Sequence, residues 1–346
     1  MRSDFKSINQ PFSNNVFVNG KTYLYFGGTA YLGIPQNQDF INLYLEGIKK
    51  FGLNNGTSRS NNIQLGIYNE AEKVAAERFH APDALITSSG YLAAQLTVNA
   101  LAFSGKVIYA PATHPALWTN HQPQSSKSFS DWNIGIIEEI NSSEENNFVL
   151  ISNSMNNLFP EIYDFNFLKD IHSNKKITLI VDDSHGIGIN NNGKGAFATL
   201  PKAKNMECVV VASMAKALGV DAGVVLASKK IIEQLKKTNA FLGASPPAAA
   251  GIYAFINAEE IYKYAWQKLQ KNIVHFSDAL NLMWRYEPGF PAFFLNNPNL
   301  ADDLIQEDVL ISSFPYPTPD SEPINRVVIS SWHDFKDITR IISVLK

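Results

Sequence analysis

Short hydrophobic runs recur along the middle of the chain, and most of them are apolar at both alternating positions. That pattern is typical of strands buried on both faces of a sheet. Helical patterns with an apolar stripe, such as residues 69–80, lie between several of the runs. The alternation predicts an α/β fold, with a large domain built on a mostly parallel seven-stranded sheet sandwiched by helices. The predicted strands cover residues 83–88, 106–110, 134–140, 148–154, 177–183, 208–213 and 222–228.

The pattern changes near residue 250. A long helical sequence follows, then two short strand-like pieces and a final helix that Asp334 can cap. We therefore predict a smaller α+β domain over residues 251–346, after a large domain over residues 36–250. At the other end of the chain, VFVNGKTYLYF predicts a hairpin that turns at Asn19-Gly20, within a separate segment over residues 1–35.

Composition and charge exclude several classes of partner. The 346-residue chain is 45% hydrophobic, and 29 basic against 32 acidic residues give a net charge of −3. Nucleic acids are bound by clustered Lys and Arg, so we expect no nucleic-acid partner. No apolar run approaches the roughly 20 residues of a membrane span, and the N-terminus lacks the apolar centre of a signal peptide. Because Cys208 is the single cysteine, no intrachain disulfide can form. We expect a soluble cytoplasmic protein with no membrane partner.

Polar segments follow five of the predicted strands. In parallel α/β sheets, ligands bind at the carboxyl ends of the strands, so these segments could meet in one crevice. The segments are SSGYLAA, APATHPALW, NSMNN, DDSHG and SMAKALG. Together they define the candidate site.

Lys216 has an unusually apolar setting, between Met214-Ala215 and Ala217-Leu218. Burial lowers the pKa of a lysine amine and makes it a nucleophile for Schiff-base formation, but a surface lysine at a helix start fits the same pattern. The glycine loop at Gly90 could bind a phosphate at a helix N-terminus, or it could be an ordinary strand-to-helix turn. His114, taken alone, is more often a structural histidine.

The combination of these residues is more specific than its parts. Pyridoxal 5'-phosphate (PLP) needs a lysine amine for its aldehyde, a carboxylate for its ring nitrogen and backbone amides for its phosphate. Lys216, Asp182 and the loop at Gly90 would supply these groups. We therefore predict PLP as the cofactor, and no metal.

The motifs also resemble a known family, the α-oxoamine synthases among the fold-type I PLP enzymes. That group includes 8-amino-7-oxononanoate synthase and serine palmitoyltransferase. VDDSHGIGINNNGKGAF is similar to the family's V-D-D-A-H-G motif, and SMAKALGVDAG is similar to its lysine motif. AYLGI, FGLNNGTSRS and SSGYLAAQ are weaker matches, and the resemblance runs from about Tyr23 to the C-terminus.

The resemblance implies a role for each matching residue. Lys216 would bind the cofactor and move the substrate's α-proton, while Asp182 would bind the ring nitrogen. His185 would hydrogen-bond the ring's phenolic oxygen, and Arg326 would bind the substrate carboxylate. His114 would stack on the cofactor ring, and Ser154 would lie near the ring oxygen. Gly90, Tyr91 and Ser213 would bind the phosphate.

The chain departs from the family pattern at several positions. Thr29 and Ala30 stand where the family has Asn-Asp, and Phe314 stands in place of an arginine. Gly243 and Ala244 replace hydroxyl residues that would contact the phosphate of a partner subunit. The cofactor residues therefore match the family better than the residues for an acyl-CoA do.

The function that the resemblance implies is decarboxylative condensation of a small amino acid with an acyl-CoA thioester. An aminotransferase would use the same Lys216, Asp182 and Arg326, and it remains an alternative. A third hypothesis is a relative that binds the cofactor or a partner without turnover, although the intact Lys216 argues against it. The resemblance also implies a homodimer with the site at its interface.

Overall fold

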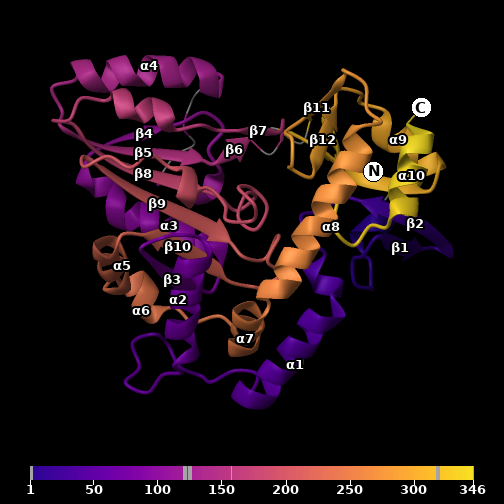
Figure 1. Ribbon diagram of the computed structural model, residues 1–346, viewed down its shortest axis with the longest axis horizontal. Helices are drawn as coiled ribbons and strands as arrows, with labels where there is room; N and C mark the ends of the chain where they lie inside the picture. Colours follow the sequence, from indigo (N-terminus) through magenta and orange to yellow (C-terminus); the bar gives the residue numbers. More distant parts are fainter. Residues whose placement is uncertain (1–2, 120–122, 124–126, 157, 317–319, 346) are drawn as a thin grey trace.

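The computed structural model describes residues 3–119, 123, 127–156, 158–316 and 320–345. The large sheet has six strands among these residues, in the order β3-β10-β9-β8-β5-β4 (Figure 1). Neighbours from β4 through β5 and β8 to β9 are parallel, whereas β10 is antiparallel to both β9 and β3. The predicted α/β class and the mostly parallel sheet are confirmed. The strands are β3 (Asp83–Thr87), β4 (Lys106–Tyr109), β5 (Asn147–Asn153), β8 (Lys176–Asp182), β9 (Met206–Ser213) and β10 (Gly223–Ala227).

One predicted strand is wrong. Residues 134–140 lie within helix α4 (Phe129–Ser142), so the described part of the large sheet has six strands rather than seven. The Ser128 hydroxyl caps this helix by accepting a hydrogen bond from the Asp131 N–H at 3.0 Å. Positions 129, 132, 136 and 140 are buried, which is a helical spacing, whereas Ile134 is 70% exposed. The cap and this spacing outweigh the β-branched composition of the run.

The central strands are buried on both faces, as their sequence pattern predicted. On β8, Leu179 and Val181 pack into the core on one face of the sheet, while Ile180 packs into the core on the other. Helices α2 (Ile67–Arg78) and α4 contribute to the first core, and helices α3 (Gly90–Leu101), α5 (Lys229–Lys236) and α6 (Asn239–Gly243) contribute to the second. The strand ends are therefore held rigidly, and the segments that follow them start from fixed positions.

A second sheet has the order β1-β2-β13-β14-β12-β11. The predicted hairpin forms, with Asn19 and Gly20 at φ values of 51° and 80°, as a tight I′-type turn requires. The hairpin also extends this sheet, because Leu24 of β2 pairs in parallel register with Val309 of β13. The strands are β1 (Asn15–Val18), β2 (Lys21–Phe26), β11 (Trp284–Tyr286), β12 (Ala292–Leu295), β13 (Val309–Pro315) and β14 (Pro323–Val328).

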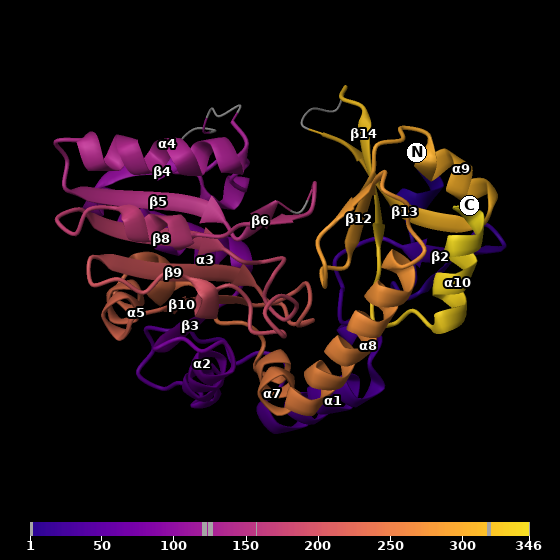
Figure 2. The same ribbon diagram turned by 45° about the horizontal axis from the view of Figure 1, so that its top comes forward.

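Helices join the two sheets along one side of the molecule (Figure 2). Helix α1 (Gln38–Phe51) packs on α7 (Ala249–Asn257), where a Cβ on Gly47 would come within 2.7 Å of Ala250 Cα. The long helix α8 (Glu259–Ser277) then leads from α7 to the second sheet, where it packs against α10 (Phe335–Val344). Helix α9 (Leu300–Gln306) precedes β13. No helix of the described chain is long and apolar enough to cross a lipid bilayer.

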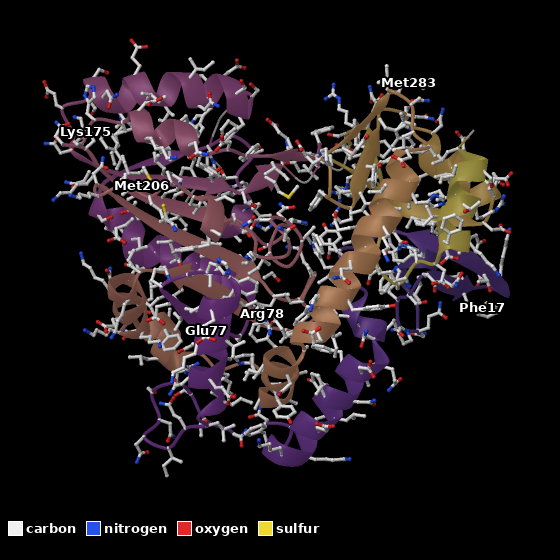
Figure 3. All side chains as sticks on the ribbon, in the orientation of Figure 1. Phe17, Glu77, Arg78, Lys175, Met206 and Met283 are labelled. Atoms are coloured by element: carbon white, nitrogen blue, oxygen red, sulfur yellow. The ribbon has the colours of Figure 1, made fainter. Side chains whose placement is uncertain are left out.

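Arg78 fastens the end of α2 to this helical side (Figure 3). Its Nε donates to Glu259 Oε2 at 2.7 Å, and one of its terminal nitrogens donates to the Phe255 carbonyl at 3.1 Å. The guanidinium also lies over the Phe255 ring, 4.5 Å from its centroid. These contacts therefore tie the large sheet to the helices that lead to the second sheet.

Candidate active site

The carboxyl ends of the parallel strands bring the predicted site residues together. His114 follows β4, Asp182 ends β8, and Lys216 follows β9. The charges of Asp182 and Lys216 both act on the pKa of His114, and Lys216, Arg326 and His114 all act on the pKa of His185. Five residues from distant parts of the sequence thus share one electrostatic site.

Lys216 lies in the loop between β9 and β10 rather than at the start of a helix. Met214 N–H donates to the Ala222 carbonyl at 2.9 Å, and Val220 N–H donates to the Met214 carbonyl at 3.1 Å, so backbone hydrogen bonds close the loop. Burial lowers the pKa of the Lys216 amine, and the Asp182 carboxylate offsets part of this effect. The position is therefore a half-buried lysine with an opposite charge nearby, which suits a nucleophilic amine better than a surface lysine.

The two neighbouring aspartates have different surroundings. Asp182 is half-buried and accepts a hydrogen bond from Ser184 N–H at 2.8 Å, and its charge acts on the pKa values of Lys216 and His114. Asp183 is 1% exposed, and its Oδ2 accepts from Ala196 N–H at 2.7 Å. Burial raises the pKa of the Asp183 carboxyl to about 7. Asp182 is thus the carboxylate beside the lysine, and Asp183 holds the loop that follows β8.

Glycines let that loop close over Asp183. A Cβ on Gly186 would collide with Asp183 Oδ1, and a Cβ on Gly195 would collide with Asp183 Oδ2. Gly195 also has a φ of 72°, a conformation that residues with a side chain rarely adopt. The glycine-rich run after the DDSHG segment therefore has a packing function around Asp183.

His185 has a partner that the sequence did not identify. Its Nδ1 lies 2.8 Å from the hydroxyl oxygen of Tyr31, which belongs to the AYLGI segment. Burial, followed by the positive charges of Lys216, Arg326 and His114, holds the pKa of His185 well below its ordinary value. The imidazole is therefore neutral at physiological pH. Tyr31 could have been found from the sequence only through its position in a motif shared with the α-oxoamine synthases.

Arg326 reaches the site from the second sheet. It lies on β14, is 6% exposed, and its guanidinium lies 5.3 Å from the ring centroid of Phe314 on the neighbouring strand β13. Burial lowers the pKa of the Arg326 guanidinium, and Tyr31 acts in the opposite direction. The second sheet thus brings one guanidinium, which packs on an aromatic ring, to the carboxyl ends of the strands of the large sheet.

His114 is fixed by its own turn. Its Nδ1 accepts from Ala116 N–H at 3.2 Å, and its backbone N–H donates to Asn153 Oδ1 at 3.0 Å. Partial burial and Lys216 lower the pKa of His114, whereas Asp182 raises it. The ring is thus oriented by the backbone and remains partly accessible.

The start of α3 has the properties of an anion site. Ser89 caps the helix by accepting from Leu92 N–H at 3.1 Å, and the first-turn N–H groups of Gly90 and Tyr91 have no acceptor within the helix. A Cβ on Gly90 would lie 2.5 Å from the Ser213 Cβ, so only glycine allows α3 to start this close to the end of β9. The Tyr91 side chain is 64% exposed, so its backbone is the part available to the site.

Ser154 is placed differently from the other predicted residues. It is buried, and its N–H donates to the Asp182 carbonyl at 2.8 Å. Its hydroxyl faces the Asp183 carboxyl, whose pKa it lowers. Ser154 therefore supports the two aspartates from the end of β5, and its predicted contact with a ring oxygen stays a prediction.

The chain belongs to the family of class I and II aminotransferases. The family model described as aminotransferase class I and II matches residues 30–345, which is most of the chain. The match covers the large sheet, strands β11 to β14 of the second sheet and every predicted site residue.

Individual relatives and solved structures indicate which members of this family the chain resembles. A putative 8-amino-7-oxononanoate synthase from Methanococcus aeolicus is 28% identical over 345 residues, covering 94% of this chain and 89% of that protein. A serine palmitoyltransferase variant from S. paucimobilis, solved with a bound PLP–myriocin aldimine, has a TM-score of 0.79 at 15% identity and covers 98% of this chain and 90% of its own. An 8-amino-7-oxononanoate synthase from Francisella tularensis has a TM-score of 0.66 at 20% identity and covers 93% of this chain and 96% of its own. The resemblance to the α-oxoamine synthases and to fold-type I is confirmed.

Proposed function

We propose that this protein is a PLP-dependent transferase that condenses a small amino acid with an acyl-CoA and releases carbon dioxide, as 8-amino-7-oxononanoate synthases do. The observation that carries the proposal is the Lys216 amine, whose pKa burial lowers, beside Asp182 and within the same electrostatic site as His185 and Arg326. Relatives named 8-amino-7-oxononanoate synthase support the reaction type.

The residues present fit PLP. Lys216 offers an amine for the aldehyde, and Asp182 offers a carboxylate for the ring nitrogen. The start of α3 offers the N–H groups of Gly90 and Tyr91 for the phosphate, and the Ser213 side chain, against which Gly90 packs, adds a hydroxyl. The cofactor, when bound, supplies an electron sink that stabilises negative charge at the substrate's α-carbon.

The chain's own residues would bind the substrate and move its proton. Arg326 would bind the amino-acid carboxylate, because its planar guanidinium can donate two parallel hydrogen bonds to the two oxygens. The Lys216 amine would take the proton from the α-carbon, since burial brings its pKa closer to neutrality. His114, oriented by Ala116 N–H, would pack on the cofactor ring and limit the access of water.

A second candidate is an aminotransferase. The family model that matches residues 30–345 carries that name, and such an enzyme would use the same Lys216, Asp182 and Arg326. The replacement of a family arginine by Phe314 also weakens the match for acyl-CoA. The two candidates would differ in their products: condensation would join the α-carbon of the amino acid to the acyl group and release a thiol, whereas transamination would release a keto acid.

We further propose a cytoplasmic homodimer whose interface includes the site. Large apolar side chains are exposed on the loop between α1 and α2 and at the start of α3: Leu53 (77%), Ile63 (75%) and Tyr91 (64%). A second copy of the chain would cover them. Size-exclusion chromatography with light scattering tests this proposal, and a monomer at micromolar concentration would contradict it.

Absorbance and product assays test the proposed function. The purified protein should be yellow after addition of PLP, and Lys216→Ala should lose that band, whereas Lys194→Ala should keep it. Thiol release and carbon dioxide from a panel of amino acids and acyl-CoAs would support condensation. Keto acid with a pyridoxamine spectrum and no thiol would support transamination instead. A wild-type protein that stays colourless with PLP would refute both.

A further inference from the structure

Tyr31 is a buried residue that links the two sheets at the site. It lies in the segment after β2, is 2% exposed, and its ring packs edge-on against Phe290 at a centroid distance of 5.6 Å. Its backbone is fixed on both sides, since Tyr31 N–H donates to the Thr29 carbonyl at 2.8 Å and Ser331 N–H donates to the Tyr31 carbonyl at 2.9 Å. The hydroxyl is therefore held in one place, 2.8 Å from His185 Nδ1.

The chemistry of the neighbours determines which atom donates in this hydrogen bond. Burial raises the pKa of Tyr31 to about 12, so the phenol keeps its proton. The charge of Arg326 also acts on this hydroxyl, but a guanidinium carries only N–H donors and cannot accept the phenolic proton. Within the described chain, His185 Nδ1 is the acceptor that the structure gives the hydroxyl.

The donor assignment fixes the protonation of the histidine. A neutral imidazole has one N–H and one lone-pair nitrogen, and the hydrogen bond on one nitrogen sets the role of the other. If Nδ1 accepts from Tyr31, the proton of His185 is on Nε2, which can then only donate. The opposite tautomer would leave the buried phenolic proton unpaired and make Nε2 an acceptor instead of a donor.

We propose that Tyr31 is a positioning residue, which donates to His185 Nδ1 and holds the neutral imidazole in the tautomer that carries its proton on Nε2. The consequence for PLP rests on the proposed function: a donating Nε2 stabilises the negative charge of the cofactor's phenolic oxygen. Tyr31 thereby acts on the cofactor through His185 and does not itself need to touch it.

Nitrogen-15 NMR of the full-length protein, with its histidine rings labelled, tests the tautomer directly. The chain has seven histidines, so the His185 signals are identified as those that His185→Gln removes. In the cofactor-free protein between pH 6 and 8, we expect a protonated Nε2 and an unprotonated Nδ1 with the shift of a hydrogen-bonded acceptor. A proton on Nδ1, or on both nitrogens, would overturn the proposal without any variant.

Tyr31→Phe tests whether the hydroxyl is responsible. In this variant the Nδ1 signal should move toward the shift of a free lone-pair nitrogen. Tyr68→Phe is the matched control, because Tyr68 is also buried and donates one hydrogen bond, to the Pro247 carbonyl at 3.0 Å. The control should leave the His185 signals unchanged. Unchanged Nδ1 and Nε2 signals in folded Tyr31→Phe would refute the role of Tyr31.

A second measurement uses the protein loaded with PLP. The pH midpoint of the change in its visible absorbance should be higher in Tyr31→Phe than in the wild type, because His185 Nε2 becomes a weaker donor and stabilises the phenolate of PLP less. The midpoint should be higher still in His185→Gln. A Tyr31→Phe midpoint equal to that of the wild type would overturn the consequence for the cofactor. If PLP does not bind at all, the proposed function fails while the NMR result still decides the tautomer.

Discussion

Asp183→Asn should change how the stability of the protein depends on pH. The Asp183 carboxyl is buried beneath the loop after β8, with Oδ2 on Ala196 N–H and glycines at positions 186 and 195 packed against it. Burial is the largest cause that raises its pKa from the ordinary 3.8 to about 7. An asparagine has nearly the same shape as the protonated acid but cannot ionise, so it isolates the cost of the charge.

The sign and size of the expected change in stability follow from the pKa values of Asp183 in the unfolded and the folded protein. Between pH 4 and pH 7 the unfolded chain loses the Asp183 proton while the folded chain keeps it, so the folded state binds more protons and stability falls as pH rises. Each pH unit in this window costs about 1.4 kcal/mol. Over the roughly three units between the ordinary and the raised pKa, the wild type should lose up to about 4 kcal/mol relative to Asp183→Asn.

Urea unfolding at several pH values measures this difference. The free energy of unfolding of wild type and Asp183→Asn should be compared at pH 5, 6 and 7.5, with Asp221→Asn, an exposed carboxylate, as the matched control. The advantage of Asp183→Asn over wild type should grow with pH, and the control should follow the wild type. Parallel curves for wild type and Asp183→Asn would refute the assignment of a neutral Asp183 in the folded protein.

Two further changes test other parts of the molecule. Glu72 is buried and accepts from Arg59 Nη2 at 3.0 Å and from Lys236 Nζ at 2.7 Å, so Glu72→Gln should cost about 3 kcal/mol in thermal or urea unfolding. Glu260→Gln, at an exposed pair with Lys263, should cost about 0.5 kcal/mol or less, and equal losses would contradict the importance of burial. Arg326→Lys keeps the charge but loses the planar fork, so KM for the amino acid should rise by about tenfold or more. The visible PLP band should persist in Arg326→Lys, and its loss would mean that Arg326 supports the cofactor rather than the substrate.

The large sheet could be predicted from the sequence because the burial of each strand is visible in the strand's own residues. The central residues of strands such as β8 and β9 alternate between two buried cores, so these central positions are all apolar and the pattern is visible without the structure. The same composition failed at 134–140, where burial follows a helical spacing set by the Ser128 cap. An apolar run shows that a segment is buried, but its period and cap decide between helix and strand.

The site was predictable where a residue's chemistry is unusual for its neighbours, as for Lys216 among small apolar residues and for Asp182 at a strand end. Tyr31 was not found because its significance depends on a contact with His185, 154 residues away. The position of the hairpin was missed for the same reason, since its pairing with β13 joins the two ends of the chain. Contacts between distant segments leave no local pattern that sequence reasoning can detect.

The charges of the candidate site explain why the pKa values of its groups depend on one another. Lys216, Arg326 and His114 all disfavour a proton on His185, while Asp182 offsets the effect of burial on Lys216. A site of this kind favours anions, because the negative charge of a phosphate or a carboxylate is attracted by several of these groups at once. Phe314 fits this account, since a second guanidinium in its place would repel Arg326, whereas the ring covers Arg326 with its negative face. The charges of these residues together favour an anionic ligand. A substitution of one residue should therefore be examined through its effect on the pKa values of the others.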